Sequence, residues 1–194
     1  MQRRSLASLL SGIGTLLTLT FLFAGGLLAW GANFSNTAVH SQLSHEKIYF
    51  PPKAAFDHPA VGTPITPSMI PSVSQYAGEQ LVTGEQAKVY ADDFLAVQLS
   101  AVAEGLTYSQ ISAKAMADPS NAVLAYQTEV IFRGTTVRGM LLNAYAIAMF
   151  SKIAQISAIA SFFLAGLMLL LTVLVFSHHR RARNAGELAE SDSK

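Results

Sequence analysis

The chain has no cysteine, and charged side chains make up only 13% of its 194 residues. Without cysteine it can form neither a disulfide nor a thiolate metal site, and it has no Cys nucleophile. A small secreted scaffold held together by disulfides is therefore excluded. An average soluble domain carries about 25% charged residues, whereas 51% of the residues here are hydrophobic. This composition favours a membrane protein.

The shortage of charge is concentrated in two stretches. No Asp, Glu, Lys or Arg occurs between Arg4 and Glu46, or between Lys152 and Arg180. Each stretch holds an apolar run longer than the roughly 20 residues that cross a bilayer as a helix. We therefore expect two transmembrane helices, at residues 6–32 and 153–177.

The first of these spans also resembles a signal peptide, because Arg3 and Arg4 precede it. The apolar region of a cleavable signal is only about 7–15 residues long, and this run is much longer. Trp30 suits an anchor at the outer interface of the membrane. We expect a retained signal anchor, and cleavage of the segment is the alternative.

Cationic residues flank both predicted spans at the ends that face the chain termini. Such residues stay on the cytoplasmic side of a membrane, and here they are Arg3, Arg4, Arg180, Arg181 and Arg183. The pattern predicts a plasma-membrane protein whose residues 1–5 and 178–194 are cytoplasmic and whose residues 33–152 are extracytoplasmic. The short C-terminal tail has mixed charge, and we expect it to be disordered.

Small residues predict that the two spans pack as an antiparallel hairpin. Ser157, Ser161 and Ala165 recur every four residues and so share one helix face, where small side chains let two backbones approach. The first span has smooth surface at its glycines, namely Gly12, Gly14, Gly25 and Gly26. Neither span holds an ionisable residue at mid-membrane depth, which disfavours ion relay by this chain alone.

The extracytoplasmic region begins with a proline-rich segment, residues 33–74. Its first part can continue the first helix for two or three turns. Prolines from position 51 to position 71 preclude a long helix, because each removes a backbone donor and restricts its neighbour. We expect an extended strap with four apolar anchors, Phe56, Val61, Ile65 and Met69.

Helical signals follow in residues 82–139. Thr83 with Gln86, and Thr107 with Gln110, match the reciprocal capping box that opens a helix. They predict helices at residues 84–104, ended by Gly105, and at residues 108–117. Asp118 with Pro119 predicts a third helix that ends before Gly134, and a fourth should run from Thr136 through the membrane to Ser177. The expected fold class is all-α, with a two-helix transmembrane hairpin carrying a small extracytoplasmic helical bundle and a proline-rich strap.

Residues able to carry chemistry are few, and we predict no catalytic, cofactor-binding or metal-binding residue. Neither a GxSxG motif nor a glycine loop for phosphate occurs outside the spans. Asp92 and its neighbour Asp93 diverge on a helix, so we expect one of them to pair with Lys88 four residues earlier. An enzyme would need His45, Glu46 and His58 gathered in one cleft. A net charge of +1 without a basic patch predicts no nucleic-acid partner.

Arg133 and Arg138 flank a predicted turn, "RGTTVRG". We expect them to act as helix-end charges that complement the helix dipole. The alternative is that they bind an anion or the carboxylate of a partner.

Four segments carry a family resemblance: "QLSHEKIYFPP", "GEQAKVYADDFLAVQL", "LTYSQISAKA" and "RGTTVRGMLLNAYA". Together they resemble two-span membrane proteins of unknown function that are widespread in actinobacteria, and the resemblance covers most of residues 1–177. It rests on hydrophobic and small residues, so it carries over no functional residue. It implies an actinobacterial plasma membrane and no established cofactor or reaction.

The sequence therefore favours two other functions over an enzyme. The first is a non-enzymatic accessory subunit or scaffold of a cell-envelope complex, in the lipid bilayer, with a membrane-protein partner or a homo-oligomer. Its expected contact surface above the membrane is Met140, Leu141, Ala144 and Ala148. The alternative is an extracytoplasmic small-ligand-binding, sensor-like protein without an output domain, whose expected pocket is lined by Tyr90, Phe94, Tyr126 and Phe132.

Overall fold

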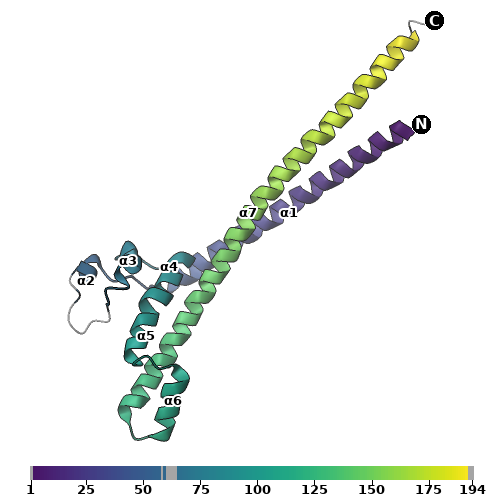
Figure 1. Ribbon diagram of the computed structural model, residues 1–194. Helices are drawn as coiled ribbons and strands as arrows, with labels where there is room; N and C mark the ends of the chain where they lie inside the picture. Colours follow the sequence, from purple (N-terminus) through teal and green to yellow (C-terminus); the bar gives the residue numbers. More distant parts are fainter. Residues whose placement is uncertain (1, 58, 60–64, 192–194) are drawn as a thin grey trace. The chain divides into compact units, whose positions relative to one another are not determined.

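A computed structural model describes residues 2–57, 59 and 65–191, and across these residues the chain is all-helical without a strand (Figure 1). Two of the helices, α1 (Gln2–Glu46) and α7 (Ala122–Ser191), are long and apolar enough to cross a membrane. The chain divides into two compact units. We name Met1–Asn33 with Lys152–Lys194 the terminal unit, and Phe34–Ser151 the central unit.

The terminal unit packs α1 against α7 through small residues. A Cβ added at Gly14 would overlap the Thr172 hydroxyl, and one added at Gly25 would lie 3.1 Å from the Phe162 ring. Ala165 is buried on α7, whereas Ser157 and Ser161 are half-buried beside it. Gly12 and Gly26, which were also expected to offer packing surface, have no such neighbour. The sequence pattern missed the buried Ala158.

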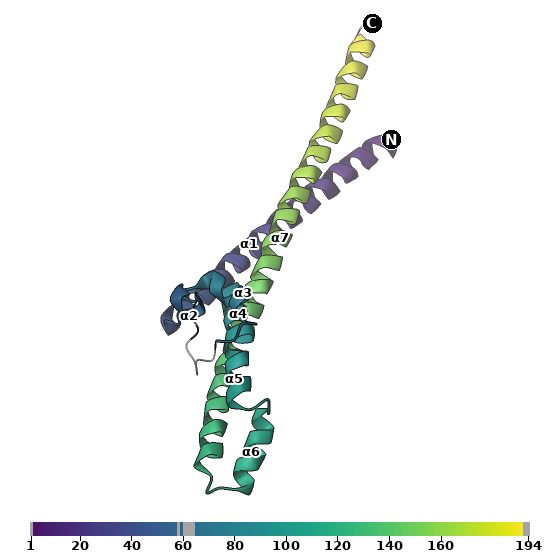
Figure 2. The same cartoon turned by 60° about the vertical axis from the view of Figure 1, so that its left-hand side comes forward.

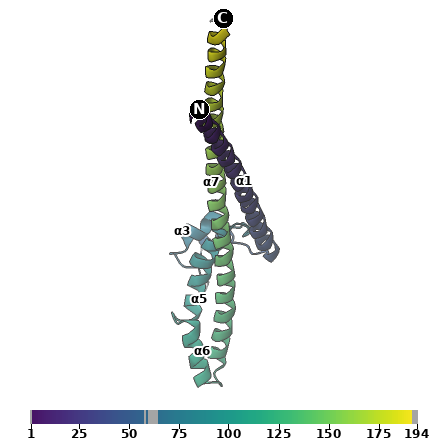
Figure 3. The ribbon, with the colours of Figure 1, turned by 90° about the vertical axis from the view of Figure 1, so that its right-hand side faces the viewer.

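The central unit contains the remaining elements: α2 (Lys53–Asp57), α3 (Ile70–Val73), the 3-10 helix η1 (Ser74–Tyr76), α4 (Gly84–Val89), the π-helical segment η2 (Tyr90–Leu95), α5 (Ala96–Val102) and α6 (Tyr108–Ala117). Figure 2 shows α2, α3 and α4 gathered near the end of α1. Figure 3 shows α5 and α6 beside the part of α7 that belongs to this unit. The first group encloses a core that includes Val39, Leu43 and Leu81, and the second encloses a smaller core around Ile111 and Ile131.

The proline-rich segment differs from the expected extended strap, because α2 and α3 fold within it as short helices. Prolines are tolerated in the first turn of a helix, and Pro71 occupies such a position in α3. The expected anchoring is confirmed for Phe56 and Met69, which are buried, and for Ile65, which packs against the core. Val61 lies outside the described residues.

The local helix signals at Thr83, Gly105 and Thr107 are confirmed. Both capping boxes form, and α6 has the predicted bounds. The helical stretch that Thr83 opens runs through α4, η2 and α5 and ends near Gly105, whose φ of 78° suits a residue without Cβ. The π-helical turns of η2 were not predicted. The first helix continues to Glu46, as expected.

Three predictions for the last part of the chain are wrong. Asp118 does not open a helix, because Asn121 caps α7 instead by accepting the amide protons of Val123 and Leu124. Gly134 does not end a helix, because α7 runs through it without a break. The backbone of the expected disordered tail is helical to Ser191.

Gly134 has a packing role in place of the predicted one. A Cβ at this position would overlap the Leu99 side chain of α5. The glycine therefore allows α5 to approach α7 closely. Gln127 supports the same contact, since its Nε2 donates to the Val102 carbonyl oxygen at 3.0 Å.

Candidate functional site

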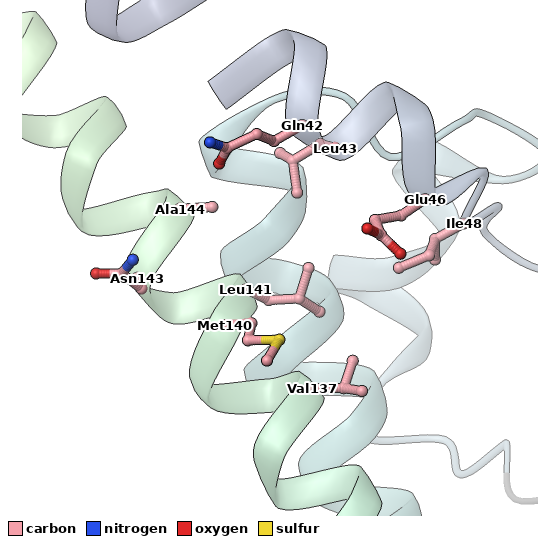
Figure 4. A pocket seen from close by; sticks show the side chains of 9 residues that line it. All are labelled: Gln42, Leu43, Glu46, Ile48, Val137, Met140, Leu141, Asn143 and Ala144. Carbon is pink, nitrogen blue, oxygen red and sulfur yellow. The ribbon is translucent and has the colours of Figure 1, made fainter. Parts of the chain in front are cut away.

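A groove of about 350 Å³ lies in the central unit between the end of α1 and α7 (Figure 4). Leu43 on α1 and Leu141 on α7 point toward each other at its floor (Figure 4). The full set of lining residues is Gln42, Leu43, Glu46, Ile48, Val137, Met140, Leu141, Asn143 and Ala144. The groove combines an apolar floor with two amides and one carboxylate.

The α1 wall exists because the helix ends abruptly. Lys47 adopts a positive φ of 50°, which turns the chain away after Glu46. The side chain of Gln80 then donates from Nε2 to the Ser44 carbonyl oxygen at 2.9 Å, which satisfies one of the unpaired carbonyls at the helix end. As a result, Leu43 is buried while Glu46 stays exposed at the rim.

The residues that form the α7 wall differ in exposure, because some pack in the protein core and others face solvent. Leu141 is only 3% exposed and packs in the core, whereas Met140 beside it is 67% exposed. Val137, one turn earlier, is also exposed. Large apolar side chains at the edge of a groove are typical of surfaces that bind another protein.

The predicted contact surface is thus only partly available. Met140 is exposed, but Leu141 and Ala144 are buried in the core of their own chain. Ala148 packs against Gly84, where an added Cβ would overlap it. The sequence reasoning missed the α1 wall, Gln42 and Glu46, although the predicted extension of the first helix was the signal that could have located it.

A charged network lies on another side of the central unit. Asp92 accepts hydrogen bonds from Lys88 Nζ at 2.9 Å and from Arg138 Nη2 at 2.7 Å. The bond from Lys88, with the further one from Arg138, lowers the pKa of the Asp92 carboxyl below its ordinary value. Arg138 Nε also donates to the Ala91 carbonyl oxygen at 3.2 Å. The predicted pair between Lys88 and Asp92 is confirmed.

The expected turn between Arg133 and Arg138 is wrong, since both residues lie within α7. Arg133 pairs with Glu129 one helical turn earlier. Arg138 instead joins α7 to the π-helical segment η2 through Ala91 and Asp92. Neither arginine is a helix-end charge, and both have a carboxylate of their own chain.

The four aromatic residues of the predicted ligand pocket occupy two places. Tyr90 and Phe94 contact each other, with ring centroids 4.9 Å apart, and burial raises the pKa of the Tyr90 phenol. Phe132 contacts Tyr108 on α6 at 5.6 Å, and Tyr126 is exposed. The structure therefore does not bring these four side chains together around one cavity.

Of the three residues that an enzyme would require, the structure describes two, His45 and Glu46. His45 Nδ1 lies 2.7 Å from the Ser41 carbonyl oxygen of its own helix, while Glu46 lines the groove. His58 lies outside the described residues. Within the part of the chain that the structure describes, no group of three His, Cys, Asp or Glu side chains is placed to hold a metal ion.

Comparison with known proteins returned nothing: no family model, no curated protein and no solved structure matches the sequence. The resemblance to the two-span actinobacterial family stays a prediction.

Proposed function

We propose that this chain is a non-enzymatic plasma-membrane protein that binds a protein partner through its central unit, as an accessory subunit or scaffold of a cell-envelope complex. In this proposal the two long helices cross the membrane as an antiparallel hairpin. The central unit is an extracytoplasmic helical bundle against which the proline-rich segment packs, and both termini are cytoplasmic.

Two observations support the membrane hairpin. Large apolar side chains of the terminal unit, such as Phe23 and Phe163, are exposed and would be costly in water. The contacts of Gly14 with Thr172 and of Gly25 with Phe162 pair residues in opposite chain order, as an antiparallel pair requires. The cationic flanks at Arg3 and Arg180 support the cytoplasmic assignment of both ends.

The groove between α1 and α7 is the observation that carries the partner-binding proposal. Its rim exposes Met140 and Val137 beside Glu46, so an apolar surface lies next to a charged residue that can orient a partner. Methionine adapts its shape to a partner surface, because its side chain is unbranched and polarisable.

Recovery of a partner from native membranes tests this proposal. After mild crosslinking and solubilisation of the full chain, we expect a stoichiometric partner to co-purify with the wild type. Met140→Asp should reduce its recovery about tenfold, because a charge would replace the apolar side chain that contacts the partner. Ala146→Asp, on an exposed part of the same helix, is the matched control and should leave recovery unchanged. A monodisperse monomer without a partner, or equal recovery from both variants, would contradict the proposal.

A further inference from the structure

Another groove, of about 370 Å³, lies in the terminal unit between α1 and α7. We call it the terminal groove. A Cβ added at Gly14 would overlap the Thr172 hydroxyl, whereas one added at Gly12 would meet nothing within 4 Å. The two helices therefore touch at Gly14 and leave open space beside Gly12. The residues that line the groove are Ser11, Gly12, Thr15, Thr172, Val173 and Phe176.

The walls of the terminal groove are mainly apolar. Thr15 Oγ1 donates to the Ser11 carbonyl oxygen at 2.9 Å, and Thr172 Oγ1 donates to the Met168 carbonyl oxygen at 2.7 Å. Both threonine hydroxyl protons are thus bound within their own helices, which leaves the methyl groups for other contacts. Val173 and Phe176 are 56% and 51% exposed and add larger apolar surface. The groove therefore suits an apolar ligand.

The position of the terminal groove in the chain indicates what surrounds it. If α1 and α7 cross the membrane at residues 6–32 and 153–177, Ser11 lies about 8 Å inside the cytoplasmic end of its span at 1.5 Å per residue. Phe176 lies next to the cytoplasmic end of the other span. The groove is then within the cytoplasmic leaflet, where the surrounding molecules are lipid chains. An acyl chain that enters it gains dispersion contacts that an empty groove would lack.

Two arginines follow the terminal groove toward the cytoplasm. Seven residues separate Arg4 from Ser11 on α1, and seven separate Val173 from Arg180 on α7. Both helices are continuous over these residues. Seven residues make almost two helical turns, so positions 4 and 180 are on the groove side of their helices, roughly 10 Å farther along. This is the depth of lipid headgroups.

The charge at this end of the groove favours an anion. The first acidic residue after Arg4 is Glu46, and the first after Arg180 is Glu187. Arg183 is also on the groove side, but Glu187 follows it by four residues, which is the spacing of a helical ion pair. The two cations without an acidic residue at this spacing are therefore Arg4 and Arg180.

We propose that the terminal groove binds one anionic phospholipid of the cytoplasmic leaflet. The upper part of an acyl chain lies in the groove, and Arg4 and Arg180 attract the phosphate of the headgroup. Basic residues beside grooves between transmembrane helices recognise anionic headgroups in this way. The inference rests on the proposed function, because it requires that the two helices cross the membrane with cytoplasmic ends. It gives these arginines a role in addition to their effect on topology.

Photocrosslinking in nanodiscs tests the lipid site. The full chain carries a benzophenone side chain at Val173, and the discs hold equal amounts of phosphatidylglycerol and phosphatidylcholine with identical acyl chains. Mass spectrometry then measures the two lipid adducts. We expect roughly tenfold more adduct with the anionic lipid, because only the headgroup differs. The same side chain at Ile159, which is 65% exposed on α7 outside the groove, is the control and should give equal amounts of both adducts.

Two double variants test the arginines. Arg4→Gln with Arg180→Gln should remove the preference for phosphatidylglycerol at Val173. Arg3→Gln with Arg181→Gln removes the same charge at adjacent positions, which are about 100° away around each helix. This matched control should keep the preference.

Four outcomes would overturn the inference. Equal adducts at Val173 would show that the groove does not select an anionic lipid. The same preference at Ile159 as at Val173, or its loss in both double variants, would indicate general attraction to the chain's charge. An adduct at Val173 with a protein and none with lipid would show that another helix fills the groove.

The control position separates failure of this inference from failure of the proposed function. In each of the four outcomes above, lipid adducts at Ile159 would leave the membrane hairpin and the partner-binding proposal intact. If neither Val173 nor Ile159 formed an adduct with any lipid, the membrane hairpin itself would be contradicted, and the lipid site with it.

Discussion

Asp92 joins two elements that are distant in sequence, because it accepts hydrogen bonds from Lys88 in α4 and from Arg138 in α7. Both partners are cationic, so the ionised carboxylate is the form that the folded chain favours. Hydrogen bonds to charged groups contribute more than neutral ones. This residue therefore links the position of η2 to that of α7.

Replacing Asp92 by Asn should destabilise the chain in a pH-dependent way. The pKa of the Asp92 carboxyl is lowered in the folded state. The ionised carboxylate therefore contributes to the free energy of unfolding above the ordinary carboxyl pKa of about 3.9, and this contribution is lost as the pH falls through the lowered value. At pH 7 we expect the free energy of unfolding of Asp92→Asn to be about 1 kcal/mol lower than that of the wild type. The difference should shrink as the pH falls below about 3.9 and the carboxylate becomes protonated.

Denaturant unfolding in detergent, followed by circular dichroism at several pH values, measures this difference. Arg138→Gln is the companion variant, because it removes one donor and leaves the Asp92 carboxyl in place. A gap between wild type and Asp92→Asn that stays the same from pH 7 to well below the ordinary carboxyl pKa would show that the carboxylate charge contributes nothing.

Two glycines of the central unit should respond oppositely to the same change. A Cβ at Gly84 would overlap that of Ala148 and approach the backbone of Tyr145, whereas one at Gly139 would enter open space. We expect Gly84→Ala to destabilise the fold by about 1–3 kcal/mol through overpacking. Gly139→Ala should stabilise it by up to about 1 kcal/mol, because alanine favours the helix.

Thermal unfolding of both variants measures these effects. The double variant Gly84→Ala with Ala148→Gly should recover part of the loss, since it relieves the overlap from the other side. If Gly84→Ala were as stable as the wild type, the close approach of α4 to α7 would be in error.

At the scale of elements, Asn121 is the residue that opens α7. Its Oδ1 accepts the amide protons of Val123 and Leu124, both at 3.2 Å. Asn121→Ala should lower stability by about 1 kcal/mol, because two backbone donors at the helix start lose their acceptor. Amide hydrogen exchange should quicken at Val123 and Leu124 while that of α6 is unchanged. Asn121→Asp keeps an acceptor and should behave like the wild type, and equal exchange in all three proteins would argue against the cap.

Several elements could be predicted from sequence because their signals are local. The capping boxes at Thr83 and Thr107 need only four consecutive residues, and both helix starts are correct. The extension of α1 to Glu46 follows from the absence of a breaker and from Val39 and Leu43 on one face.

The wrong predictions arise where a local signal competes with packing. Asp118 with Pro119 resembles a helix start, but the Asp118 carboxylate instead accepts hydrogen bonds from Ser120 and Asn121 within the turn. Gly134 resembles a helix end, but its lack of a Cβ serves the contact with Leu99. The groove was not predictable either, since its two walls lie about a hundred residues apart in the sequence.

At the scale of the whole molecule, charge and hydropathy both indicate a membrane protein with two spans. Two long apolar helices with cationic ends flank a central unit whose cores are filled by its own side chains. The groove between the end of α1 and α7 leaves the apolar side chains of Met140 and Val137 exposed at its rim. This distribution of apolar surface is the basis for the proposal that the protein acts through association in a membrane.

Cysteine labelling is the most direct test of the central claim, that the central unit lies outside the cytoplasmic membrane. Met116 is 72% exposed on α6, so Met116→Cys provides a single reactive thiol in an otherwise cysteine-free chain. A membrane-impermeant maleimide should label it in intact cells, whereas Glu187→Cys in the C-terminal tail should react only after the cells are opened. Labelling of Met116→Cys only in opened cells, with Glu187→Cys accessible from outside, would contradict the account.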